Sequence, residues 1–185
     1  MVRPMSEGTD RLITMLTAFD ARVQAAKEGD WSRPAPCDGW VARDVVDHVA
    51  NNILNITAGL SGAAPQAISA DEDIVAGWDR AFAAAKSVLP SADTSQNLPG
   101  PMGPMPAEML IGRLVSMDTL VHTWDLARAV GGDERLDADA VAHAYEGIKP
   151  MDAMIRRPGV FGPKVECPAG ADLQTEFLCF LGRPV

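Results

Sequence analysis

The chain is poor in cysteine and in positive charge. Its three cysteines, Cys37, Cys167 and Cys179, are odd in number and widely spaced, which argues against a disulfide framework and against a Cys-x-x-Cys metal site. Lys and Arg number 16 against 25 Asp and Glu, and no basic run interrupts this net charge of −9. Because phosphate binding needs a basic patch, the balance argues against a nucleic-acid partner.

Long apolar runs are also missing. The apolar stretch Leu12–Phe19 is flanked by charged residues and is far too short to span a bilayer, and nothing before it is typical of a secretory signal. We therefore expect no membrane segment and a cytoplasmic protein. Apolar residues still make up 47% of the 185 residues, enough for a buried core, and the length fits one domain over residues 1–185.

Apolar residues recur with the period of a helix in four long segments. They predict helices over residues 7–27, 41–60, 71–89 and 107–130, with Asp71 and Glu72 at the start of the third helix and Gly131 and Gly132 ending the fourth. Segments rich in Pro and Gly, among them residues 90–106, separate these helices. The pattern predicts an all-α, up-down four-helix bundle.

The remainder of the chain adds smaller elements. A fifth helix is predicted from Asp137 or Asp139 to about Ile155, and a short apolar helix over Thr175–Leu181 should dock on the bundle. Residues 158–168 contain Pro and Gly and are predicted to be an extended or loop segment. Strand signals are otherwise weak.

Ionisable residues fall inside the apolar stripe of the fourth helix. Asp118, His122 and Asp125 share the arc of its apolar residues, and burial of such groups is unfavourable unless they are paired or bind a metal. Asp118 and His122 are four residues apart and therefore project from one face. His48 lies at the edge of the apolar arc of the second helix. Two imidazoles and one carboxylate on facing helices predict an open site for a divalent metal.

Other interpretations fit the same residues. Asp118 and His122 could form a buried ion pair, and His48 could be a residue at the rim of the core. Asp125 could hold His122 or Asp118 in place, although a hydrogen bond at a helix end or in a loop explains it at least as well.

Three further residue types receive simpler interpretations. Cys37 could be a thiol near the site, but a small buried filler is the preferred interpretation. Trp40 and Trp124 are interpreted as packing residues, and His143 as a solvated residue.

The side of the fourth helix opposite its apolar arc is expected to carry Arg113, Ser116, Thr119, Thr123, Ala127 and Arg128.

Two runs of sequence resemble a known family. The run PCDGWVARDVVDHV, ending just after His48, resembles the start of the metal-binding domain of mycothiol-dependent maleylpyruvate isomerases, and DTLVHTWDLAR, from Asp118 to Arg128, resembles its second signature. That domain belongs to the DinB-like superfamily of metal-binding four-helix bundles. The ending around Leu181-Gly-Arg-Pro is similar to that of actinobacterial single-domain members. The resemblance implies a DinB-like bundle with an additional C-terminal helix and a short extended tail, and metal ligation by His48, Asp118 and His122.

The resemblance also implies a chemistry. It suggests zinc, or else nickel, and mycothiol as cosubstrate in a transferase or isomerase reaction on a small electrophile. Asp118 departs from the glutamate that is usual in the isomerase, and the thirty or so residues after the fifth helix are too few for the isomerase's second domain. The alternative is a non-catalytic metal-binding or stress-response module. No general base can be named from the sequence, and the oligomeric state stays open, a homodimer included.

Overall fold

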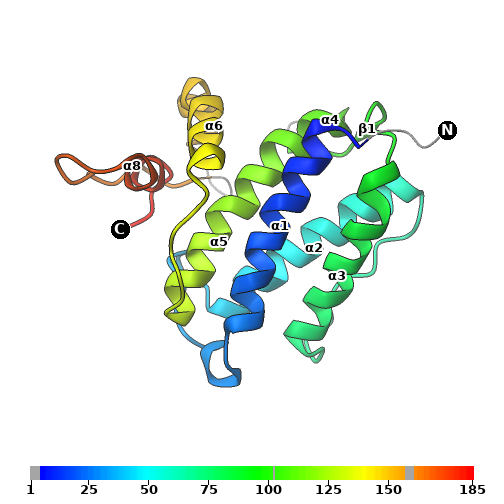
Figure 1. The fold of residues 1–185 in the computed structure, drawn as a ribbon, viewed down its shortest axis with the longest axis horizontal. Coiled ribbons are helices and arrows are strands. Elements are labelled where there is room, and N and C mark those ends of the chain that lie inside the picture. Colours follow the sequence, from blue (N-terminus) through cyan, green and yellow to red (C-terminus); the bar gives the residue numbers. More distant parts are fainter. Residues whose placement is uncertain (1–4, 102, 157–160) are drawn as a thin grey trace.

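Four helical segments form the bundle that positions the site (Figure 1). A computed structural model describes residues 5–101, 103–156 and 161–185. The bundle consists of α1 (Glu7–Ala25), α2 (Ala42–Ser61), α3 (Ile74–Val88) and a composite fourth segment made of α4 (Ala107–Met109), a π-helical stretch (Leu110–Val115) and α5 (Ser116–Val130). These bounds lie close to the predicted ones, and the predicted all-α fold is confirmed.

The direction of α3 differs from the predicted up-down alternation. Arg43, near the start of α2, donates hydrogen bonds to the carbonyls of Ala70 and Glu72, just before α3 begins. Helices α2 and α3 therefore start at the same end of the bundle and run in the same direction. The connection 62–73 makes this possible, because twelve extended residues reach about 40 Å, whereas the twenty residues of α2 rise only about 30 Å.

Local signals at the helix ends account for most of the element boundaries. The side chain of Ser6 caps α1, and Asp73 caps α3, so the helix begins slightly later than the predicted start at Asp71 and Glu72. Helix α5 ends where Gly131 adopts a left-handed conformation with φ of 72°, as its sequence predicts.

Smaller elements follow and connect the bundle helices. The loop over residues 90–106 contains an antiparallel pair of two-residue strands that the sequence did not predict, β1 (Asn97–Leu98) and β2 (Met105–Pro106). Three-residue 3₁₀ turns occur at Glu28–Asp30, Leu89–Ser91 and Lys149–Met151.

The predicted fifth helix is divided. It forms α6 (Ala138–Ile148), capped by Asp137, and α7 (Asp152–Ile155), because Pro150 lies in the 3₁₀ turn between them. The short C-terminal helix is α8 (Leu173–Phe180). Of the predicted loop over residues 158–168, residues 158–160 lie outside the described residues, and 161–168 form no helix or strand.

Helix α5 lies at the centre of the structure, between the other bundle helices and the C-terminal elements (Figure 1). It packs against α1 and α2 and also contacts α6. Ser116, Thr119 and Thr123, on the side opposite the predicted apolar arc, are also buried, so both sides of α5 face other parts of the protein. Ser116 and Thr123 donate hydrogen bonds to carbonyls of their own helical segment, which satisfies their hydroxyls inside the core.

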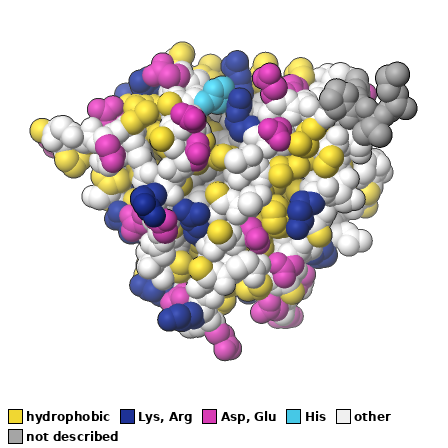
Figure 2. All heavy atoms as spheres, viewed as in Figure 1, with side chains coloured by type: hydrophobic (Ala, Val, Ile, Leu, Met, Phe, Trp, Pro, Cys, Tyr) yellow, Lys and Arg dark blue, Asp and Glu magenta, His cyan; other side chains and the backbone are white. Residues whose placement is uncertain are grey.

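The surface is mixed in character. Figure 2 shows acidic, basic and apolar side chains interspersed over one face of the molecule. His143 is exposed, as predicted. Among the helices of the described residues, none is long and apolar enough to cross a membrane.

Candidate metal centre

The structure brings His48, Asp118 and His122 together at the interface of α2 and α5. His48 Nε2 lies 3.1 Å from Asp118 Oδ2, and His122 Nε2 lies 3.4 Å from Asp118 Oδ1. The candidate ligand atoms of the three residues all lie within 4.8 Å of one another. The helical spacing of Asp118 and His122 and the approach of α2 thus produce the convergence that the sequence predicts.

The donor set fits a tetrahedral divalent metal. Metal–ligand bonds of about 2.0 Å place neighbouring ligand atoms of a tetrahedron roughly 3.3 Å apart, close to the two separations between a histidine nitrogen and an Asp118 oxygen. Two imidazole nitrogens and one carboxylate leave one position open, which is the pattern of reactive zinc sites. His48 and Asp118 are about one-third exposed, whereas the side chain of His122 is 8% exposed, so the open side faces away from His122.

Trp40 forms one wall of the site. Its indole stacks on the His122 ring, with centroids 5.7 Å apart and planes at 16°, and lies at a tilt 5.2 Å from the His48 ring. The interpretation of Trp40 as a residue with only a packing role is therefore incomplete. Its ring covers both imidazoles and limits their rotation. Trp124, by contrast, is fully buried away from the triad, beneath Arg128.

The turn before α2 delivers both Trp40 and Cys37 to the site. The Trp40 amide donates a hydrogen bond to the Cys37 carbonyl, and Gly39 between them has a φ of 74°. This four-residue turn needs a positive φ at its third position, which glycine adopts without strain. Cys37 is half-buried at the site, so the alternative of a thiol near the site holds and the preferred filler interpretation is wrong.

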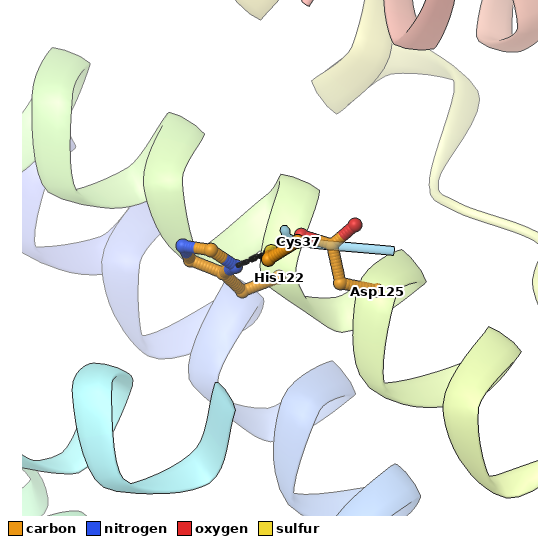
Figure 3. Close-up of side chains that lie close together, drawn as sticks. All are labelled: Cys37, His122 and Asp125. Carbon is orange, nitrogen blue, oxygen red and sulfur yellow. Dashed lines mark hydrogen bonds and ion pairs between the residues drawn. The ribbon is translucent and has the colours of Figure 1, made fainter. Parts of the chain in front are cut away.

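A second layer of hydrogen bonds lies behind His122 (Figure 3). Asp125 Oδ2 lies 2.9 Å from His122 Nδ1, on the side of the ring away from Asp118. Arg183 donates two hydrogen bonds, of 3.0 and 2.8 Å, to the Asp125 carboxylate. The Cys37 thiol donates a third hydrogen bond, of 3.2 Å, to the same carboxylate. Because the Nδ1 proton is bound by a carboxylate, Nε2 of His122 is left to face Asp118 and His48.

Three residues of this hydrogen-bond network also form a second group of potential metal ligands, but the network explains their arrangement better than a metal does. Cys37, His122 and Asp125 also come within 4.8 Å of one another. However, the guanidinium of Arg183 already bonds both oxygens of Asp125, and a cation there would face that fixed positive charge. The two groups use opposite nitrogens of His122, so the thiol of Cys37 does not point at the triad centre.

Electrostatics within the cluster favours a charged arrangement. Burial alone would raise the pKa of Asp118, but the charge of His122 and hydrogen bonds from both histidines lower it well below its ordinary value. Burial would lower the pKa of His122, and the charge and hydrogen bond of Asp118, with bonds to Asp125 and Cys37, raise it well above its ordinary value. A divalent cation at the triad would neutralise the same carboxylate.

A cavity of about 1570 Å³ opens directly on the triad. Its polar lining includes Cys37, Asn52 and Arg183 together with the three candidate ligands. Asn52 Nδ2 lies 3.3 Å from Asp118 Oδ2 and 3.1 Å from His48 Nε2, at the edge of the triad.

Arg183 is the principal residue that sequence reasoning missed. It lies 58 residues after Asp125 in the chain, and its side chain is 13% exposed at the wall of the cavity. In the sequence, the ending Leu181-Gly-Arg-Pro stands out only through its family resemblance. Helical periodicity cannot pair its arginine with Asp125, because the two residues lie on different elements. Asp125 contacts His122, as its predicted supporting role requires. It also accepts hydrogen bonds from Arg183 in the segment after α8, as the alternative of a hydrogen bond in a loop requires.

Comparison with known proteins gives a consistent family match. Residues 14–127 match the family described as the mycothiol maleylpyruvate isomerase N-terminal domain. Two uncharacterized proteins of Mycobacterium tuberculosis, from strains CDC 1551 / Oshkosh and ATCC 25618 / H37Rv, are each 29% identical over 172 residues, covering 91% of this chain and 93% of their own. No solved structure matches the chain significantly.

Proposed function

The chain belongs to the mycothiol maleylpyruvate isomerase N-terminal domain family, and on that premise we propose that it binds a divalent metal and uses a low-molecular-weight thiol. The metal is zinc, or else nickel, and the thiol is mycothiol. The reaction is a thiol transfer or thiol-assisted isomerisation on a small electrophile. The observation that carries this proposal is the convergence of His48, Asp118 and His122 on the wall of a large cavity.

The ligand types agree with this choice of metal. Imidazole suits zinc and nickel, and three protein ligands with an open position distinguish reactive zinc sites from closed structural ones. When bound, the metal lowers the pKa of a coordinated thiol and makes it a nucleophile at neutral pH. One carboxylate and two neutral imidazoles would leave a net charge of about +1, which favours an added anion such as a thiolate.

The chain's own residues prepare this site in two ways. Asp125 binds Nδ1 of His122, which would leave Nε2 to hold a metal at the centre of the triad. Trp40 covers the two imidazole rings and excludes water from that side, which strengthens electrostatic interactions within the site.

The size of the cavity supports a reaction with two partners. Pockets for one small ligand usually measure about 300–1,000 Å³. The cavity next to the triad measures about 1570 Å³ and therefore has room for a thiol and a second reactant. A non-catalytic metal-binding module would need no such space at its metal, so this observation favours the enzyme over the alternative.

Cobalt substitution tests the proposed thiol binding. We expect the cobalt-loaded protein to show a new sulfur-to-cobalt charge-transfer band when mycothiol or a simpler thiol is added, because thiolate is a soft ligand suited to the open position. The matched control is the Cys37→Ala variant, which should give the same band because the Cys37 thiol points to Asp125. An unchanged spectrum at millimolar thiol would contradict the proposal and favour the binding module.

A further inference from the structure

The cavity next to the triad follows one face of α2. Its lining residues on this helix include His48, Asn52, Ile56 and Gly59, which recur at helical spacing. Gly59 is eleven positions after His48, which corresponds to roughly 16 Å at the rise of an α-helix. The cavity is therefore an elongated groove that begins at the metal ligands and continues well beyond them.

The opposite wall of the groove runs antiparallel to α2. It is formed by the π-helical stretch and α5, which contribute Leu110, Leu114 and Met117 before Asp118 and His122. Both walls therefore have ionisable residues at one end and uncharged, mostly apolar residues at the other. The two polar ends coincide, because His48 lies beside Asp118.

The far end of this groove is apolar, and we call it the apolar half. It is lined by the apolar side chains of Ile56, Leu98, Leu110, Leu114 and Val115, and Asn55 is the polar side chain that α2 adds beyond Asn52. Within the described residues, no charged side chain lines the groove from α2 beyond Asn52, from residues 98–101 or from the π-helical stretch. Arg156 and Lys164, which also line the cavity, belong to the C-terminal region and both pair with Asp152.

The apolar half is accessible from the groove. Ile56 and Val115, each 8% exposed, and Leu110, 7% exposed, all line the cavity, so their remaining exposed surface faces it. This small remaining exposure is what burial by a ligand would remove. We take a small molecule as the occupant because the groove is continuous with the triad. A molecule with one atom bound to the metal would have the rest of its structure in the groove.

From this geometry we infer that the electrophilic substrate carries an uncharged apolar tail, aliphatic or aromatic. Its reactive group lies at His48, Asp118 and His122, and its tail lies in the apolar half. Burial of the tail supplies binding free energy in proportion to the apolar area removed from water. The inference rests on the proposed metal site, and it adds the class of substrate that this site would take.

A homologous series of metal-binding probes tests the inference. We propose calorimetric titration of the zinc-loaded protein with straight-chain alkyl hydroxamates, from acetohydroxamate to decanohydroxamate. The hydroxamate head tests the metal site, and the tail tests the groove. Affinity should increase about fourfold per added methylene, equivalent to about 0.8 kcal/mol, until the apolar half is filled.

Two variants identify the surface responsible. Leu114→Gln should flatten the dependence of affinity on chain length and leave acetohydroxamate binding unchanged, because it puts an amide into the apolar half. Leu60→Gln is the matched control, since Leu60 is also a partly buried leucine packed on the same core and does not line the groove. Its chain-length dependence should equal that of the unmodified protein.

The outcomes separate this inference from the proposed function. If acetohydroxamate does not bind, or binds equally well without zinc, the proposed metal site is refuted. Zinc-dependent binding whose affinity does not increase with chain length would leave the metal site intact and overturn the inference of an apolar tail. Sedimentation of the unmodified protein as a dimer that Leu114→Gln converts to a monomer would also overturn it, because the groove would then bind a second copy.

Discussion

Replacing His122 by alanine should abolish stoichiometric binding of zinc or cobalt. His122 is the most buried of the three candidate ligands, and it joins the triad on one side and Asp125 on the other. Without its imidazole, only His48 and Asp118 would remain as ligands at the site. Metal content after dialysis, measured by elemental analysis, would show the loss directly.

The sequence offers a matched control for this variant. His143 is exposed on α6, away from the site, and His143→Ala should retain the metal content of the unmodified protein. Circular dichroism would verify that both variants fold. If His122→Ala does not fold, Asp118→Asn provides the same test, since it keeps the shape of the side chain and removes the charge that attracts the metal. Unchanged metal content in a folded variant of either residue would refute the ligand assignment.

Replacing Asp125 by alanine should weaken both the fold and the metal site. Asp125 is fully buried and Arg183 nearly so, and removing one partner leaves the guanidinium without compensation. We expect the free energy of unfolding to fall by about 3 kcal/mol. Metal affinity should fall by about 10–100-fold, because His122 loses the carboxylate that orients its ring. Urea denaturation and a competitive zinc titration would measure the two effects.

A surface ion pair is the control for this second variant. Asp133 bonds Arg135 on the surface, where both side chains are well exposed, so Asp133→Ala should change neither stability nor zinc affinity appreciably. Retention of normal zinc affinity by a folded Asp125→Ala protein would show that the Asp125–His122 contact has no part in metal binding.

The sequence predicted the parts of the site that depend on helical periodicity. Asp118 and His122 stand out because ionisable residues interrupt an apolar arc, and their four-residue spacing fixes their relative position without further information. His48 could be added because bundle sites are built from facing helices. The family motifs supported the same three residues.

The parts that escaped prediction depend on contacts without a local period. Cys37 and Trp40 lie in a turn, and their positions at the site follow from the positive φ of Gly39 and the direction of the following helix. Arg183 reaches Asp125 across 58 residues of chain. Local sequence patterns cannot predict such contacts, because they form only when α8 and the residues after it pack beside α5.

Two features of the fold were hidden for similar reasons. The burial of the side of α5 opposite its apolar arc could not be predicted from residue types, because the hydroxyls of Ser116 and Thr123 bond carbonyls within the same helical segment and can be buried. The parallel course of α2 and α3 depends on the length and path of the connection 62–73, and an amphipathic pattern reveals a helix's buried face without revealing its direction.

X-ray absorption at the zinc edge tests the central claim most directly. We predict that the zinc-loaded protein shows only nitrogen and oxygen neighbours, two of them imidazoles, at about 2.0–2.1 Å. Addition of mycothiol should introduce one sulfur at about 2.3 Å. A sulfur neighbour before thiol is added would mean that Cys37 is a ligand and would contradict the assignment of His48, Asp118 and His122 as an open triad. A spectrum that remains free of sulfur after thiol is added would contradict the proposed thiol chemistry.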